Sequence, residues 1–350
     1  MNVALRVLVI DLESPLCDVL VAFLESCSDV EVVGVGRGGR DAVRLVQRLR
    51  PTVVAMGTST LTFGGIQAIR QIMRTVPTPI IVMAERSVSG DVAQRSDAFE
   101  ALHAGALMVV TAPCPSQPDS YAVVLDALRS MASVPVVHRW ERQAAQPRRA
   151  SGVVSAMSAQ DWAVRMRQVD IIGIAASTGG PAALTTLFRA LPAGFPIPIV
   201  VVQHVTPGFV TGFAQWLDAQ TPLRVRMATA GTLPEPGSVL LSPDDYHVHL
   251  SRLGKIVLHQ QAPYKGLRPS ANYLFASLAE AYGPRALGIV LTGMGDDGAD
   301  GLVQLHRRGG LTLAQDERSS VVYGMPQQAL RRQAVDRVLG LADIAAAIGG

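Results

Sequence analysis

The chain has 350 residues, of which 49% are hydrophobic, 17% are charged and only 5% are aromatic. This length predicts two domains, whose cores must consist mainly of aliphatic side chains. The formal net charge of +3 is small for such a chain and argues against a nucleic-acid-binding protein. The three cysteines are widely separated, which excludes a cysteine-rich metal site and is typical of reduced, cytoplasmic thiols.

The sequence shows no sign of membrane insertion or export. No apolar run approaches the ~18 residues that a transmembrane helix needs. The N-terminal segment lacks the charged region and the long apolar region of a signal peptide. We therefore expect a cytoplasmic protein that inserts into no membrane, and no motif in the chain predicts a bound metal ion or another cofactor.

Strand-like and helix-like patterns alternate five times in the first part of the chain. Strands separated by helices in this way predict a parallel sheet that is covered on both faces. We therefore expect residues 1–131 to form an α/β, doubly wound domain of flavodoxin type, with its functional edge at the carboxyl ends of the strands. The expected strands are Leu5–Asp11, Val30–Val35, Thr52–Met56, Pro79–Met83 and Ala106–Val110.

The next segment changes in character. The apolar period weakens, and between positions 138 and 168 there are six arginines against one glutamate and one aspartate. We interpret residues 132–167 as a linker between two domains. A solvated tether is the simpler interpretation of the arginines, and a docking surface for an acidic partner is the alternative.

Residues 168–350 are expected to form a second doubly wound parallel-sheet domain of Rossmann-like type, with a β-hairpin. Its expected strands are Val169–Ala175, Ile197–Val202, Leu223–Met227, Ser238–Leu241, Ala286–Leu291 and Leu311–Ala314. The hairpin is expected at His247–Leu250 and Lys255–His259. Helices are expected to follow Gly180, Pro207, Pro269, Asp297 and Pro326.

Three polar side chains stand where strands of this second domain should end. Ser177 follows an apolar run and precedes two glycines, after which a helical pattern begins at Pro181. His204 follows a second apolar strand, and the Asp296–Asp297 pair follows a third. Because the carboxyl ends of parallel strands share one edge of a sheet, a serine, a histidine and an aspartate can converge there.

The three residue types together predict nucleophilic catalysis. A serine hydroxyl is a weak nucleophile at neutral pH, and a histidine with a pKa near about 6.5 can take its proton and later return it. A carboxylate selects the histidine tautomer and stabilises the imidazolium. Backbone amides at the glycine-rich turns could bind an oxyanion, which is worth about 3 kcal/mol per donor in comparable sites.

Each residue alone also has a structural explanation. Ser177 or Thr178 could cap the following helix, and Asp297 could do the same for its own. His204 could simply pair with backbone at a strand end. The order serine, histidine, aspartate differs from that of the α/β-hydrolases. A phosphate-binding loop lacks the required lysine, and the aspartates near position 297 do not have the spacing of a calcium loop.

Five motifs of the second domain resemble those of the protein-glutamate methylesterases of bacterial chemotaxis, the CheB family. The motifs are GIAASTGG at 173–180, QHVTPGF at 203–209, RPS at 268–270, LTGMGDDG at 291–298 and VVYGMP at 321–326. The resemblance implies a hydrolase for glutamate methyl esters on chemoreceptor helices, and many members also deamidate receptor glutamines. It implies that Ser177 is the nucleophile, His204 the base and Asp297 the orienting carboxylate.

The same resemblance suggests further roles near the triad. Thr178 and the backbone amide of Met294 stand where the family places its oxyanion contacts. Arg268 is a candidate substrate contact, although a structural salt bridge explains it equally well. Asp296 occupies a position that is often asparagine, so we expect an extra negative charge beside the triad.

The family carries an N-terminal receiver domain, and here the first domain departs from the pattern. A receiver needs a phosphoacceptor aspartate after its third strand, an acidic pair that holds Mg²⁺, a hydroxyl and a lysine. Gly57 stands at the phosphoacceptor position, Ala84 at the hydroxyl position and Ala112 at the lysine position. Asp11 keeps one acid, but Leu12 follows it. We predict a pseudo-receiver that keeps the fold, binds no metal and is not phosphorylated there.

The leading hypothesis is a cytoplasmic serine hydrolase in bacterial chemosensory signalling. Its expected partners are methylated chemoreceptor helices, together with a chemosensory histidine kinase or other pathway proteins. Two alternatives stay open: a non-catalytic signalling scaffold, and a methylesterase that serves a non-motility pathway. The pseudo-receiver could inhibit the active site, respond to a protein partner or simply dock, and the sequence does not choose among these.

Overall fold

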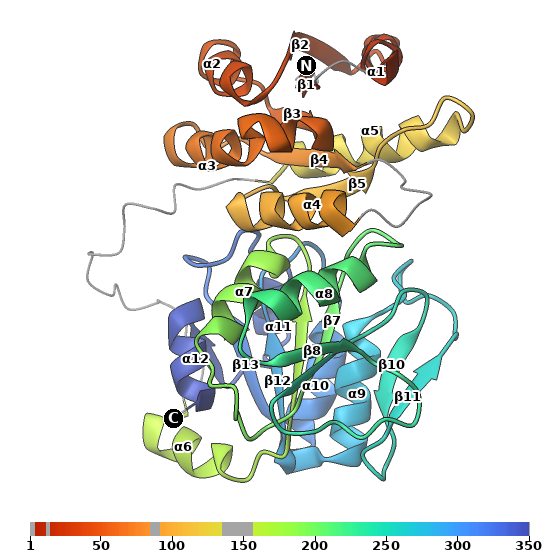
Figure 1. Ribbon diagram of the computed structural model, residues 1–350. Helices are drawn as coiled ribbons and strands as arrows, with labels where there is room; N and C mark the ends of the chain where they lie inside the picture. The colour runs from red at the N-terminus through yellow and green to blue at the C-terminus, as the bar shows by residue number, and fades with distance from the viewer. Residues whose placement is uncertain (1–3, 12–14, 85–91, 135–156, 350) are drawn as a thin grey trace. The chain divides into compact units, whose positions relative to one another are not determined.

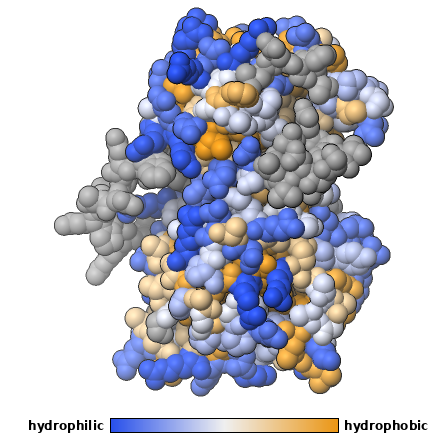
Figure 2. All heavy atoms as spheres, viewed as in Figure 1, coloured by the Kyte–Doolittle hydropathy of each residue, from blue (hydrophilic) through white to orange (hydrophobic). Residues whose placement is uncertain are grey.

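The computed structural model describes residues 4–11, 15–84, 92–134 and 157–349 (Figure 1). The chain divides into two compact units, Met1–Ala145 and Gln146–Gly350. Both are α/β units built on parallel sheets, which confirms the predicted fold class. On the face shown in Figure 2, polar residues are interspersed with small groups of apolar ones.

The first unit contains a five-stranded parallel sheet in the order β2-β1-β3-β4-β5, which is the flavodoxin-like order. The expected strands are all present, with small shifts at their ends. They are β1 (Leu5–Ile10), β2 (Val30–Gly36), β3 (Val53–Gly57), β4 (Ile80–Ala84) and β5 (Met108–Thr111). The helices are α1 (Pro15–Glu25), α2 (Gly39–Leu49), α3 (Ile66–Thr75), α4 (Val92–Ala104) and α5 (Asp119–Ala132).

The second unit contains a seven-stranded sheet in the order β14-β13-β12-β6-β7-β9-β8, and every pair in it is parallel. The strands are β6 (Ile171–Ala176), β7 (Ile199–Gln203), β8 (Arg224–Met227), β9 (Ser238–Leu241), β12 (Ala286–Val290), β13 (Leu311–Gln315) and β14 (Arg337–Leu339). The predicted hairpin is present as β10 (His247–Leu250) and β11 (Ile256–His259), which pair antiparallel. Strand β14 was not predicted, because its three half-buried residues give no apolar run.

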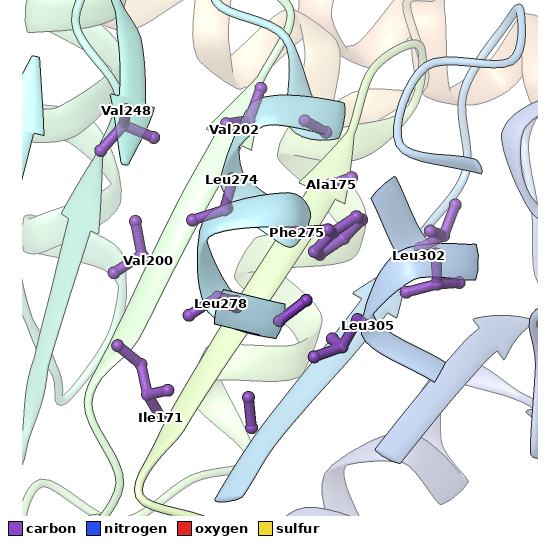
Figure 3. Close-up of a cluster of buried hydrophobic side chains, with 14 of the residues drawn as sticks. Ile171, Ala175, Val200, Val202, Val248, Leu274, Phe275, Leu278, Leu302 and Leu305 are labelled. Carbon is purple, nitrogen blue, oxygen red and sulfur yellow. The ribbon is translucent and has the colours of Figure 1, made fainter. Parts of the chain in front are cut away.

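Helices follow each of the expected positions in the second unit. They are α7 (Gly180–Arg189), α8 (Val210–Gln220), α9 (Ala271–Ala281), α10 (Ala299–Arg307) and α11 (Met325–Arg331), and α12 (Leu341–Gly349) closes the described chain. Figure 3 shows α9 packed against the sheet, with Phe275 near Ala175 and Leu278 near Val200 and Ile171. Full burial of such side chains stabilises the fold by about 1.5–3 kcal/mol each. The central strands β6, β7 and β12 are buried along their whole length, so their ends are held rigidly.

Helix α6 (Ala159–Met166) lies inside the segment that the sequence suggested as a linker. Trp162 is only 2% exposed, and its indole Nε1 donates to the Ala347 carbonyl at 3.0 Å. The guanidinium of Arg337 lies 5.3 Å from the centre of the Trp162 ring. The second compact unit therefore begins before residue 168, and its first helix packs near its C-terminus.

Helix α6 was not predicted, because the many arginines of this segment suggested a solvated linker. Trp162 and Met166 stand four positions apart and are both buried, which is a helical apolar spacing, but the surrounding charges suggested solvation. Arg165 is not a solvated tether residue, because its guanidinium donates to the Gly309 carbonyl. Most of the predicted linker, residues 135–156, lies outside the described residues.

Truncation of Trp162 tests the role of α6. We expect Trp162→Ala to lower the free energy of unfolding of the second unit by about 3–5 kcal/mol, because it leaves a cavity. Urea denaturation of the full chain, followed by circular dichroism, would measure the loss. Val164→Ala is the matched control, because Val164 is 54% exposed on the same helix. Equal midpoints for the two variants would show that α6 contributes nothing to the unit.

The hairpin carries a cluster of imidazole rings on one face. His247 faces His259 across the two strands, and the His249 and His259 ring centres are 4.2 Å apart. The ring of Tyr273 from α9 packs 4.0 Å from His247. Burial lowers the pKa of His249 from 6.5 to about 4, and repulsion by the neighbouring imidazoles acts in the same direction. His249 is therefore uncharged at neutral pH.

A depressed histidine pKa makes stability depend on pH. Above about pH 6.5, His249 is neutral in both states; between about 6.5 and about 4 the unfolded chain gains a proton that the folded protein refuses. The free energy of unfolding should therefore fall as the pH drops through that window. His249→Leu should reduce the fall between about pH 7 and about pH 5, as measured by urea denaturation. Parallel pH profiles for the two proteins would contradict this account.

Candidate functional site

Ser177 lies directly beyond β6, on the turn that leads into α7. Its amide donates to the Thr292 carbonyl at 3.0 Å, and its carbonyl accepts from the Gly180 amide at 2.7 Å. Gly179 has a φ of 78°, a conformation that favours glycine, and it precedes the first residue of α7. Neither Ser177 nor Thr178 caps the helix, because the cap position is Gly179. The half-buried Ser177 side chain thus remains available at the edge of the sheet.

His204 lies directly beyond β7, which is the neighbour of β6 in the sheet. Ala176 and Gln203 are register partners, so Ser177 and His204 each stand one residue past a paired position. The His204 amide donates to the Ala176 carbonyl at 3.0 Å, which continues the ladder by one bond. The parallel register therefore places the serine and the histidine side by side along the sheet edge.

Asp297 reaches the histidine from the other side of β6. It lies in the loop after β12, and its Oδ2 is 2.9 Å from Nε2 of His204. The Asp297 side chain is 2% exposed and the His204 side chain is 14% exposed. The sequence alone allowed Asp297 to cap α10, but the cap of that helix is Gly298. The structure therefore brings the predicted histidine and aspartate into direct contact.

Donors from the start of α9 surround the Asp297 carboxylate. It accepts hydrogen bonds from Ser270 Oγ at 2.5 Å, from the Ala271 amide at 2.7 Å and from Asn272 Nδ2 at 2.9 Å. The positive end of the helix dipole also favours an anion at this position. Burial by itself raises the pKa of Asp297, but the hydrogen bonds from His204, Ser270 and Ala271 outweigh it and hold the pKa below its usual value. The group is therefore an ionised carboxylate at neutral pH.

The hairpin contributes indirectly to the binding of the Asp297 carboxylate, through Ser270. His247 is fully buried, and its Nδ1 accepts a hydrogen bond from the Ser270 amide at 3.1 Å. Its Nε2 lies 3.3 Å from the Ala262 carbonyl, which fixes the tautomer with the proton on Nε2. Burial lowers the pKa of His247, so the ring stays neutral and keeps its acceptor. The hairpin thus orients Ser270, which in turn binds Asp297.

Sequence reasoning did not assign roles to Ser270, Asn272 or His247. Ser270 and Asn272 did carry a signal, because a serine before a helical pattern is a common cap, and Ser270 accepts from the Asn272 amide at 3.3 Å. Their second role, as donors to a carboxylate 25 or more positions away, has no local pattern.

The loop with Met294 approaches Ser177 closely. A Cβ atom on Gly293 would lie 2.8 Å from Ser177 Cβ, so only glycine fits there. The Gly293 carbonyl accepts from the amides of Gly324 and Met325 at 3.1 and 2.9 Å, which fixes the peptide next to Met294. The main chain of Thr178 is also fixed, since its carbonyl accepts a hydrogen bond from Thr292 Oγ1 at 2.9 Å. Thr178, in the serine turn itself, and Met294, in the loop that approaches it, are therefore both next to Ser177.

Asp296 adds less charge to the site than its sequence position suggested. Its Oδ2 lies 2.6 Å from Lys265 Nζ and 2.8 Å from Arg332 Nη2, and Arg332 also pairs with Asp300 at 2.8 Å. The hydrogen bond from Lys265 is the main reason why the pKa of Asp296 lies below its usual value. The carboxylate is ionised but paired, so it does not act as a free charge beside His204.

Arg268 forms a structural ion pair in the described protein. Its Nε donates to Asp245 Oδ1 at 2.8 Å, and its Nη1 donates to the Gln261 carbonyl at 3.0 Å. The structural salt bridge that the sequence allowed is therefore present, and a role of Arg268 as a substrate contact stays a prediction.

The corresponding edge of the first unit has a different chemistry. Gly57 ends β3, and a Cβ atom there would lie 2.6 Å from Asp11 Oδ1. Ser59 Oγ donates to the same oxygen at 2.7 Å. On the neighbouring strands, the Ala112 amide donates to the Ala84 carbonyl, and both residues are alanines that carry no hydroxyl or ammonium group. The end of the Asp11 side chain thus lies directly beside Gly57.

Within residues 4–11, 15–84, 92–134 and 157–349, no cluster of His, Cys, Asp and Glu side chains has an arrangement that could hold a metal ion. Over the same ranges, none of the helices combines the length and the apolar character that a membrane crossing requires.

Comparison with known proteins agrees with the motifs. Residues 172–348 match the family model of the CheB methylesterase. A protein-glutamate methylesterase/protein-glutamine glutaminase of Myxococcus xanthus is 42% identical over 98% of this chain and 96% of its own length, and one of Nitrosospira multiformis is 40% identical over the same shares. The catalytic domain of Thermotoga maritima CheB methylesterase is 36% identical, with a TM-score of 0.50, and the match covers 51% of this chain and 97% of that domain. The chain therefore belongs to the CheB methylesterase family.

Proposed function

We propose that this protein is a serine hydrolase that removes methyl groups from glutamate methyl esters of chemoreceptor-like proteins. The relatives named above are called protein-glutamate methylesterase and protein-glutamine glutaminase, which supports the ester as substrate and glutamine deamidation as a second activity. The proposed setting is cytoplasmic chemosensory signalling, with methylated receptor helices as substrate and a pathway histidine kinase as a further partner.

The proposed mechanism follows from the arrangement of the triad. Asp297 occupies the Nε2 edge of His204, so Nδ1 is the nitrogen left to exchange a proton with Ser177. Ser177 Oγ attacks the ester carbonyl and gives its proton to His204, and the collapse of the tetrahedral intermediate releases methanol with that proton. Water, deprotonated by His204, then hydrolyses the acyl-serine and leaves a glutamate carboxylate.

Backbone amides complete the proposed chemistry. The amides of Thr178 and Met294 are our candidates to bind the oxyanion, where each donor is worth about 3 kcal/mol. The Thr178 amide shares a peptide group with the Ser177 carbonyl, which accepts from the Gly180 amide at 2.7 Å. The Met294 amide shares one with the Gly293 carbonyl, which accepts from the amides of Gly324 and Met325. An amide that is already oriented gains its full value when the negative charge develops.

The observation that carries the proposal is the buried pair of His204 and Asp297. A carboxylate that is 2% exposed is costly unless it is fully hydrogen-bonded. In a scaffold without catalysis, an apolar residue at position 297 would serve the fold at least as well. The retained charge, with its donors from Ser270, Ala271 and Asn272, therefore favours the enzyme over the scaffold.

Removal of the nucleophile tests the enzyme directly. We expect Ser177→Ala to lower methanol release from a methylated receptor by more than about 1000-fold, because no other group can form the acyl-enzyme. Release is measured by gas chromatography with the purified full chain. Ser251→Ala, at the tip of the hairpin, is the matched control and should keep the wild-type rate. Equal release by the Ser177 variant would refute the serine as nucleophile.

We further propose that the first unit is a pseudo-receiver that is not phosphorylated at the usual position. Glycine has no group that could form an acyl phosphate, and the carboxylate of Asp11 lies where a side chain on Gly57 would begin. A single acidic side chain holds Mg²⁺ weakly. Control of the esterase would then depend on contacts of the pseudo-receiver and not on its phosphorylation.

A phosphodonor experiment tests this pseudo-receiver. After incubation with acetyl phosphate and Mg²⁺, we expect intact-mass spectrometry to show no added phosphoryl group in residues 1–130. Gly57→Asp should also stay unlabelled, because the second acid and the lysine are still missing, and its carboxylate is repelled by Asp11. Stable labelling of the wild-type chain within residues 1–130 would overturn the proposal.

A further inference from the structure

Gln203 is the last residue of β7 and is only 3% exposed, yet the triad does not account for its side chain. Its Nε2 donates to the Ser177 carbonyl at 2.9 Å and to the His204 carbonyl at 2.9 Å. A carboxamide nitrogen carries two hydrogens, so both are used. One side-chain atom therefore binds the main chain of the proposed nucleophile and of the proposed base.

The hydrogen-bond ladder of the sheet does not reach the carbonyls of Ser177 and His204. The ladder between β6 and β7 ends with the pair Ala176 and Gln203, and one more bond runs from the His204 amide to the Ala176 carbonyl. Beyond that bond, each chain turns away into its own loop. The carboxamide of Gln203 joins the two loops at the first residue after the ladder ends, where the catalytic side chains begin.

The orientation of the carboxamide is restricted by its surroundings. A Cβ atom on Gly180, the first residue of α7, would lie 2.0 Å from Gln203 Oε1. Within the described residues, this buried Oε1 has no hydrogen-bond donor. A buried acceptor without a donor destabilises a fold, so an apolar side chain would be expected at this position if stability alone mattered. The side chain of Gln203 therefore contributes through the two N–H donors of its carboxamide.

We propose that Gln203 is a positioning residue, which sets the separation of Ser177 and His204 by binding both of their carbonyls. The inference rests on the proposed function of these two residues. A small displacement between nucleophile and base slows the chemical step, by about 100-fold for a shift on the order of 1 Å. Binding of a methylated receptor does not involve the buried Gln203, so the Michaelis constant should be unaffected.

Two substitutions of Gln203 keep the approximate size of its side chain and remove its hydrogen-bond donors. Gln203→Met removes both donors without adding a charge, and Gln203→Glu replaces them with a carboxylate that faces two carbonyl oxygens. We expect kcat to fall about 100-fold in both, with KM for methylated receptor unchanged. Gln220→Glu, at the C-terminus of α8 beside Arg189, is the matched control and should keep wild-type kinetics.

The pH dependence gives a signature that a purely structural role would not produce. A protonated carboxyl has one O–H donor, so kcat of the Q203E protein, relative to that of the Q203M protein, should rise as the pH is lowered. The rate at which a fluorophosphonate labels Ser177 should fall by the same factor as kcat. Because that reaction needs no receptor, it tests the positioning role even if the proposed substrate is wrong.

The outcomes are distinct. If fluorophosphonate labels Ser177 of the wild-type protein but no methanol is released from methylated receptor, the proposed substrate is rejected. The labelling rates of the two Gln203 variants then decide the positioning role. Wild-type kcat and labelling rate in a folded Q203M protein would overturn the positioning role alone. If circular dichroism shows that both variants are unfolded, Gln203 serves the fold and not the spacing of the catalytic pair, which also overturns the inference.

Discussion

The contact between His204 Nε2 and Asp297 Oδ2 is the interaction that ties several elements of the second unit to one buried charge. A buried carboxylate is tolerated only when donors surround it, and the donors to Asp297 come from separate parts of the chain. β7 presents His204, the start of α9 presents its amides, and the hairpin orients Ser270 through His247. Helix α9 and the hairpin, which carry none of the three proposed triad residues, are therefore needed to satisfy the charge of Asp297.

The adjacent aspartates 296 and 297 show how environment separates two identical side chains. Asp297 is buried among neutral donors and a histidine, so its negative charge acts on that imidazole. Asp296 is 28% exposed and is paired with Lys265 and Arg332, so its charge is balanced locally. The loop that carries both is thus anchored on one side by cations and on the other by the start of α9.

Much of the fold and the contact between His204 and Asp297 could be predicted because the signals are local. Apolar runs mark the central strands, and parallel strands bring their carboxyl ends together, so Ser177 and His204 follow neighbouring strands and Asp297 contacts His204. What could not be predicted depends on distant partners: Trp162 packs near the C-terminus, and Arg268 pairs with Asp245. No pattern of nearby residues shows whether an arginine in the sequence will find such a partner or will contact substrate.

The two units are constrained by different chemistry. In the second, small changes around Ser177 are sterically excluded: a side chain on Gly293 would strike the serine, and one on Gly180 would strike Gln203. In the first, Asp11 accepts from Ser59 and lies directly beside Gly57 at the equivalent sheet edge. On our proposal that position 57 forms no acyl phosphate, that edge has no covalent event that could shift the unit between two states. Regulation by the first unit would then come from differential binding of a partner or substrate to its conformations, whose free energy would replace that of a phosphoryl group.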